Sequence, residues 1–268
     1  MLGVHTNYAS IVAQGAVNKS NNLLTNAMER LSTGLRINSA ADDAAGLQIA
    51  NRMNANVRGM ETASRNISDA TSMLQTADGA LEELTTIGNR QKELATQAAN
   101  GVNSSADLTA LNDEFKELTS EIERIIENTT YAGNNLFDKL SGGVDFQIGT
   151  GITEILSVTV EKADLVGAAD DLSVAGGATT GITAVDKFIN DVGTARSTLG
   201  ANINRLGHTA SNLASVTENT KAAAGRIMDA DFAVESANMT RNQLLVQAGT
   251  TVLSSANQNT GLVMGLLR

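Results

Sequence analysis

The chain of 268 residues contains no proline, and this absence constrains its fold more than any other feature. About 13 prolines would be expected at the usual share of ~5%. Because proline breaks helix interiors and sheet ladders, a chain without it can form long uninterrupted elements. Tryptophan is also absent and aromatic residues make up 3%, so the apolar residues are mainly Ala, Leu, Ile and Val. This composition favours helices that pack on one another through small and branched side chains.

The remaining composition excludes several classes of protein. With no cysteine, the chain has neither a disulfide framework nor a thiolate metal site. A net charge of −10 without a basic cluster argues against nucleic-acid binding. No apolar run approaches the ~18 residues that span a membrane. Residues 1–10 lack the basic and apolar regions of a secretory signal peptide, so we expect no cleaved signal.

Residues spaced by alternating steps of four and three predict a helix near each end of the chain. The first stripe is Val17, Asn21, Leu24, Met28, Leu31 and Leu35. The second is Leu245, Gly249, Val252, Ala256, Asn259, Val263 and Leu266. Both are typical of coiled-coil seams. The second stripe uses Gly, Ala and Asn where a stable isolated bundle would use Leu, so we expect its helix to need a close partner.

Long helices are predicted between these two segments. Ser39 with Asp42 or Asp43 is typical of a helix start, a hydroxyl cap followed by first-turn carboxylates. That helix runs to about residue 100, where an Asn-Gly pair ends it. A third helix follows the serine pair at 104–105. Its heptad stripe is Leu108, Leu111, Phe115, Leu118, Ile122 and Ile125. Helical periodicity returns at about residue 185 and persists almost to the end.

Between the third helix and residue 185 the apolar period changes to two. Val144, Phe146 and Ile148 alternate with polar neighbours, and a second apolar run lies at 155–160 beyond a glycine-containing turn. This pattern predicts a β-hairpin. The segment from about Asp164 to Gly181 is rich in Gly, Ala, Asp and Thr and is predicted to be a surface loop. The expected fold is mainly α: a long antiparallel helical bundle or coiled coil with a small β-hairpin, its N- and C-termini paired.

No group of side chains has the spacing of a catalytic or metal site. The Asp42-Asp43 pair is explained by a helix N-terminus, which negative charge stabilises. Asp229 and Asp231 lack the glycine turn and the twelfth-position glutamate of a calcium loop, so we expect them to end a helix. No phosphate-binding glycine loop occurs. The two histidines, His5 and His208, lack spaced partners. We therefore expect a protein that is not an enzyme and that holds no cofactor or metal.

One set of side chains on the second helix stands apart from the apolar stripes. Arg90, Leu94 and Gln97 are spaced at i, i+4 and i+7, which places them on one helical face. Glu114 of the next helix approaches that face if the two helices pair. By spacing alone, an ordinary bundle surface with a half-buried Leu94 is the simpler interpretation.

Long runs in this order make the chain similar to the bacterial flagellins. They include LSTGLRINSAADDAAGLQIANRM (31–53), SMLQTADGAL (72–81), ELATQAAN (93–100), FQIGT (146–150) and STLGANINRL (197–206). The tail adds RIMDADFAVESANMTRNQLLVQAGTTVLSSANQ (226–258) and the ending LLR (266–268). The resemblance covers nearly the whole chain. It implies an exported structural subunit that polymerises into the helical flagellar filament for swimming motility, located outside the cell.

The resemblance also implies an organisation and a set of partners. Residues 1–42 and 228–268 would form a terminal coiled coil in the inner tube of the filament. Residues 43–227 would form the outer tube as a helical bundle with a β-hairpin, with only a short variable loop at about 164–183. The implied assembly seam is Leu24, Met28, Leu31, Leu35, Leu245, Val252, Ala256, Val263 and Leu266. Implied partners are further copies of the chain, the export apparatus and flagellin chaperone, and the filament cap and hook-associated junction proteins.

Host receptors for flagellin are also among the implied partners. Arg90, Leu94, Gln97 and Glu114 match the flagellin surface that an innate-immune Toll-like receptor recognises. Leu266 and Leu267 match the region sensed by cytosolic inflammasome receptors. The alternative hypothesis is a helical secreted protein that does not polymerise, such as a flagellar junction adaptor or a type III effector with flagellin-like ends.

Overall fold

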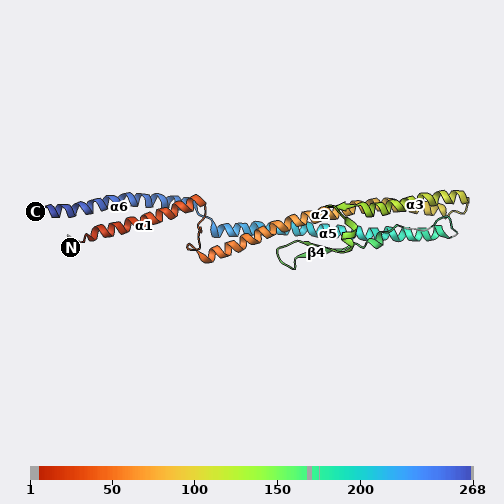
Figure 1. The fold of residues 1–268 in the computed structure, drawn as a ribbon, viewed down its shortest axis with the longest axis horizontal. Helices are drawn as coiled ribbons and strands as arrows, with labels where there is room; N and C mark the ends of the chain where they lie inside the picture. The colour runs from red at the N-terminus through yellow and green to blue at the C-terminus, as the bar shows by residue number, and fades with distance from the viewer. Residues whose placement is uncertain (1–5, 168–170, 175, 267–268) are drawn as a thin grey trace. The chain divides into compact units, whose positions relative to one another are not determined.

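The computed structural model describes residues 6–167, 171–174 and 176–266, with side chains described as far as Gln258 (Figure 1). Its helices are α1 (Tyr8–Thr33), α2 (Ala44–Ala98), α3 (Ser105–Asn128), α4 (Leu136–Ser141), the short 3-10 helix η1 (Lys162–Leu165), α5 (Gly177–Met228) and α6 (Phe232–Leu266). Residues 1–55 and 219–268 form one unit, here called the terminal unit, and residues 56–218 form the central unit. No helix in the described part of the chain is long and apolar enough to cross a bilayer.

In the terminal unit, α1 and α6 lie side by side in opposite directions, as expected for a chain whose two ends pair (Figure 1). The Asn7 side chain at the start of α1 donates to the carbonyl of Ala256, and Arg30 near its end contacts Glu235 in the first turn of α6. α1 ends at Gly34, whose φ of +72° is a left-handed conformation that favours glycine.

The central unit is a bundle of α2, α3 and α5, which run alongside one another (Figure 1). Its main core joins buried leucines of α2 to Ile122 of α3 and to Phe188 and Val192 of α5. A second cluster around Leu94, Phe115 and Val185 extends the core. The expected long helices are therefore confirmed, and they are held by ordinary apolar burial.

The predicted hairpin is also present, as strands β3 (Val144–Gln147) and β4 (Ile155–Val158) in an antiparallel pair. Leu156 and Val158 of β4 are buried in the main core. Asn66 of α2 donates to the carbonyl of Gln147 at 3.1 Å. A Cβ on Gly59 would lie 2.7 Å from the Thr150 methyl group, so this glycine lets the hairpin turn approach α2 closely.

A second, two-residue ladder was not expected from the sequence. Strand β1 (Thr130–Tyr131) pairs with β2 (Asn134–Asn135) across Ala132 and Gly133. Both central residues have positive φ, 50° and 80°, as a type I′ hairpin turn requires. Alanine rarely adopts this conformation, so the usual sequence signal of the turn is missing.

Two details of the predicted helix boundaries are wrong. Asp43, not Ser39, caps α2, because its Oδ1 accepts from the Gly46 amide at 2.8 Å. Asp42 instead accepts from the amide and the hydroxyl of Ser39. α5 begins at Gly177, so residues 177–181 are helical rather than part of a loop. The buried side chain of Ala178 belongs to the second core cluster and explains this earlier start.

Candidate functional site

The pairing face of α1 and α6 is narrow and mixes small with branched side chains. On α1 a stripe of less exposed positions runs through 13, 17, 20, 24, 27 and 31, at alternating steps of four and three. The buried side chains of this stripe are Ala13 and Ala27. On α6 the corresponding face runs through 235, 242, 246, 249, 253 and 256. Each helix therefore buries one stripe against the other and leaves the rest of its surface uncovered.

Gly249 sets how closely the two helices approach. A Cβ at this position would lie 2.5 Å from the Cγ2 of Val17, well inside contact distance. The Cα of Val17 lies 4.0 Å from the same point, which is an ordinary van der Waals distance. Glycine at 249 therefore permits this close approach, and a larger residue would require the Val17 side chain or the helices to shift.

Polar contacts fix the register of the pair at both ends. Arg30 lies 3.2 Å from the Glu235 carboxylate, whose side chain is 10% exposed. Asn7 donates to the Ala256 carbonyl at 2.9 Å. A short antiparallel link joins residues 34–36 to 227–230, with Arg36 donating to the Met228 carbonyl and Ala230 to the Gly34 carbonyl. In this one alignment of α1 on α6, these polar groups have hydrogen-bond or ion-pair partners.

Some residues of the predicted seam lie on the face between α1 and α6, and others are exposed. Leu24, Leu31, Leu35 and Ala256 are half-buried within the chain. Met28, Leu245 and Val252 are 47%, 50% and 57% exposed. Val263 and Leu266 lie beyond the residues whose side chains are described, and Leu267 lies outside the described residues altogether. Sequence reasoning missed Val246 and Leu253, which occupy the face of α6 that packs on α1.

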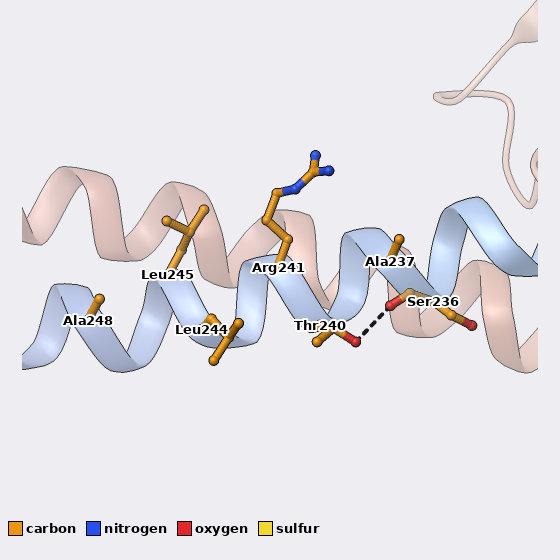
Figure 2. Close-up of a pocket in the computed structure, with 7 residues that line it drawn as sticks. All are labelled: Ser236, Ala237, Thr240, Arg241, Leu244, Leu245 and Ala248. Atoms are coloured by element: carbon orange, nitrogen blue, oxygen red, sulfur yellow. Dashed lines mark hydrogen bonds between the residues drawn. The ribbon is translucent and has the colours of Figure 1, made fainter.

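A shallow, largely open strip, here called the groove, lies along the outer face of α6. Its lining residues are Ser236, Ala237, Thr240, Arg241, Leu244, Leu245 and Ala248 (Figure 2). Leu244 is 61% exposed. Figure 2 shows the Arg241 side chain extending away from the α6 backbone, and Thr240 donates its hydroxyl hydrogen to the Ser236 carbonyl. Sequence reasoning singled out Leu245 of this set but not the groove, because apolar residues surround α6 and no period marks one outer face.

The surface predicted around Arg90 lies in the central unit. The Arg90 guanidinium contacts Glu114 of α3 at 2.7 Å and Glu93 of its own helix at 3.0 Å. Hydrogen bonds to Glu114 and then to Glu93 raise the pKa of Arg90 above its ordinary value, so it stays charged. The helices do bring Glu114 to Arg90, and Gln97 is exposed. Leu94, however, is 1% exposed and belongs to the core.

The acidic residues considered for chemistry act at helix ends. Asp231 Oδ1 accepts from the amides of Ala233 and Val234 at the start of α6. Hydrogen bonds from the Ser39 amide and hydroxyl lower the pKa of Asp42. His208 is exposed on α5, and His5 lies outside the described residues. Within the ranges that the structure covers, no cluster of His, Asp and Glu could hold a metal ion.

The family models and the curated relatives that match this chain are those of one family. Residues 4–141 match the bacterial flagellin N-terminal helical region, and residues 182–267 match the C-terminal helical region. A flagellin of Halalkalibacterium halodurans is 44% identical over 247 residues, 90% of this chain and 91% of the relative. A flagellin of Bacillus subtilis is 38% identical over 302 residues and 99% of each chain. The crystal structure of Bacillus cereus flagellin has a TM-score of 0.50 at 32% identity, covering 56% of this chain and 88% of that one. With its paired terminal helices and its central bundle, the chain belongs to the bacterial flagellin family.

Proposed function

We propose that this flagellin polymerises through its terminal helix pair, so that residues 1–42 and 228–268 line the inner tube of a filament. Residues 43–227 then form the surrounding outer tube. Family membership makes the chain a structural subunit of a flagellar filament outside the cell, and not an enzyme. The observation that carries the finer assignment is the surface of α6.

α6 exposes apolar side chains on the faces that α1 leaves uncovered. Leu244, Leu245 and Val252 are each at least half exposed, although Asn242 and Glu235 are buried against α1. A helix with apolar residues all round is one that is buried on all sides. Exposed apolar patches of this kind mark interaction sites. Since α1 covers one face, further copies of the chain are the natural cover for the others.

The charge distribution supports the same conclusion. α1 and α6 together carry five charged side chains: Lys19, Glu29, Arg30, Glu235 and Arg241. Interface cores are depleted in charged residues. The chain as a whole has a net charge of −10, which opposes packing of many copies. Salt screens this repulsion, so polymerisation should improve as ionic strength rises.

The same uncovered helix accounts for the proposed handling of the subunit before assembly. An apolar α6 needs a cover between synthesis and incorporation, which is a role for the flagellin chaperone. The export apparatus delivers the subunit, the filament cap receives it, and the hook-associated junction proteins precede it in the filament. These partners follow from the family, and the exposed side chains Phe232, Leu244 and Val252 are the features of this chain that favour a chaperone.

The polymerisation test uses purified monomer with added salt or filament seeds, observed by negative-stain electron microscopy. Long filaments are expected. Removing residues 259–268 should abolish them while leaving the central unit folded, as circular dichroism would report. Normal filaments from the truncated chain would contradict a role for the terminal pair. If the full chain forms no filaments under any of these conditions, the non-polymerising alternative, a junction adaptor or effector, is favoured.

We also propose that the surface around Arg90 binds an innate-immune flagellin receptor. Arg90, Gln97 and Glu114 are exposed and support this role, whereas the buried Leu94 supports the helix from inside. Arg90→Ala should weaken receptor signalling without changing helicity. Lys92→Ala is the matched control, since Lys92 is a half-exposed cation on the same helix with its own partner, Asp186. Equal signalling from wild type and Arg90→Ala would refute the proposal.

A further inference from the structure

The groove on α6 has a single charged residue, Arg241, and that residue has no charged or hydrogen-bonded partner among the described residues of its own chain. Arg241 lines the groove together with apolar and hydroxyl side chains (Figure 2). Among the described residues, no ion pair or hydrogen bond involves its guanidinium. Where such a groove is covered, an arginine without an acceptor is costly, because a buried charge needs a partner.

The carboxylates of the paired helices leave one candidate for that partner. Glu235 is 8% exposed and already contacts Arg30 within the chain. Glu29 is exposed, and within the described ranges its carboxylate contacts no cation. α1 and α6 contain no other carboxylate side chain.

Glu29 cannot serve Arg241 of its own chain in the observed alignment. Ala27 and Leu31 lie on the face of α1 that packs on α6, and Glu29 is two residues from each, so it lies on the opposite face. Because Arg30 pairs with Glu235, Arg241 lies opposite a position about five residues before Glu29 on α1. Glu29 and Arg241 are therefore separated by on the order of 8 Å along the helix axis.

The outer face of α1 that carries Glu29 is open and carries little charge. Gly15, Asn22 and Glu29 are spaced by seven residues and therefore share a face, and Ile11, four residues before Gly15, extends it. Glu29 is the only charged member of that set. Ile11 is 55% exposed, and nothing lies within 4 Å of the point where a Cβ on Gly15 would be, so this face is open.

We propose that the groove on α6 holds the outer face of α1 from a second copy of the chain, and that Arg241 of one copy pairs with Glu29 of the other. The contact rests on the proposed polymerisation and specifies its register. It joins different surfaces of two copies, so each copy offers Glu29 to one neighbour and Arg241 to another. Such a heterologous contact continues from copy to copy and generates a helical polymer when it does not close. Charge pairs at the edge of apolar seams are known to select register and orientation.

Charge reversal tests the pair. Glu29→Arg and Arg241→Glu each place like charges at the contact, and each should raise the critical concentration for polymerisation at least about tenfold at low salt. The double variant Glu29→Arg/Arg241→Glu should return it close to the wild-type value. Lys139→Glu, a charge reversal at an exposed position of the central unit, is the matched control and should not raise the critical concentration in this way. Circular dichroism checks that each monomer is folded.

An equimolar mixture of the two single variants separates a contact between copies from one within a chain. If the pair joins copies, alternating variants bring Arg at 29 against Glu at 241, and the mixture should polymerise although each variant alone does not. Rescue by the double variant without rescue by the mixture would place the pair within one chain and overturn the proposal. Wild-type polymerisation by both single variants, or no rescue in either experiment, would also overturn it. Failure of the wild-type chain itself to polymerise would refute the proposed function as well, and is recognised by that control.

Discussion

The central unit buries leucines, whereas the pairing face of the terminal helices buries two alanines and two polar side chains. Leu74, Leu81 and Leu84 of the central unit are completely buried among side chains of the same unit. The buried side chains of the pair are Ala13 and Ala27 of α1 and Glu235 and Asn242 of α6, while Leu244 and Val252 of α6 are exposed. Burying a leucine side chain stabilises a fold by roughly 1.5–3 kcal/mol, and an alanine offers much less. The central unit therefore supplies its own core, whereas the terminal pair leaves several large apolar side chains exposed.

The strongest test of this contrast is one substitution made in both regions. Leu84→Ala should lower the free energy of unfolding of the monomer by about 2–5 kcal/mol, because it opens a cavity in a filled core. Leu244→Ala should change that quantity by less than about 0.5 kcal/mol, because the side chain is exposed in the single chain. Chemical denaturation monitored by circular dichroism measures both.

The same Leu244→Ala variant should be impaired in polymerisation instead. Losing an apolar side chain from an interface should raise the critical concentration about tenfold or more. If Leu244→Ala polymerises like the wild type, the exposed face of α6 is not an assembly surface and the contrast between the two units fails.

A smaller effect is expected from two glycine substitutions. Gly249→Ala places a methyl group 2.5 Å from Val17 Cγ2, so the Val17 side chain or the two helices must shift. The net cost is on the order of 1 kcal/mol after the helix propensity gain, or about a fivefold rise in critical concentration. Gly79→Ala in α2 has open space around the new methyl group and should stabilise the central unit by about 0.5–1 kcal/mol. Equal effects at the two positions would show that Gly249 does not set the helix spacing.

The smallest effect concerns acid, and here the two regions should behave alike. Hydrogen bonds from Ser104 lower the pKa of Asp107 in the central unit, and those from Ser39 lower the pKa of Asp42 in the terminal unit. A depressed pKa means that each carboxylate stabilises the fold above its unfolded pKa of about 4, and that this stability is lost as pH falls through the lower folded pKa. NMR titration of the two carboxyl groups measures both values. Stability that increased on acidification through this range, or a folded pKa above 4 at either residue, would contradict the assigned hydrogen bonds.

Sequence reasoning succeeded where one principle dominates. Leucine stripes without proline predict α2 and α3, and the change to a period of two predicts the β3–β4 hairpin. It missed the β1–β2 ladder, because alanine at 132 rarely adopts the positive φ of this turn and so gives no turn signal in the sequence. It placed the start of α5 too late, because the packing of Ala178 against the second core cluster carries no signal in a Gly- and Thr-rich segment.

The site was harder to predict, because the seams of α1 and α6 are ambiguous in the sequence. Leu245 and Val252 continue a heptad as well as Val246 and Leu253 do, so spacing alone cannot tell which set faces α1. The charged residues carry the missing information. Arg30 and Glu235 mark the face used within the chain, while Glu29 and Arg241 lie on the faces left over. Spacing alone predicts a half-buried Leu94 beside Arg90, and packing against α3 buries it almost completely.

The apolar circumference of α6 changes how natural variants of this chain should be interpreted. For most proteins, a solvent-exposed position tolerates substitution, and exposure is used to rank variants by severity. On α6 the proposed assembly reverses that ranking, because Leu244 and Val252 are exposed in the single chain and would be covered by further copies. We expect a charged residue at either position to leave the subunit folded and to impair polymerisation, and with it swimming. Variant surveys of this protein should therefore score motility and abundance separately, since substitutions on α6 are expected to change the first without the second.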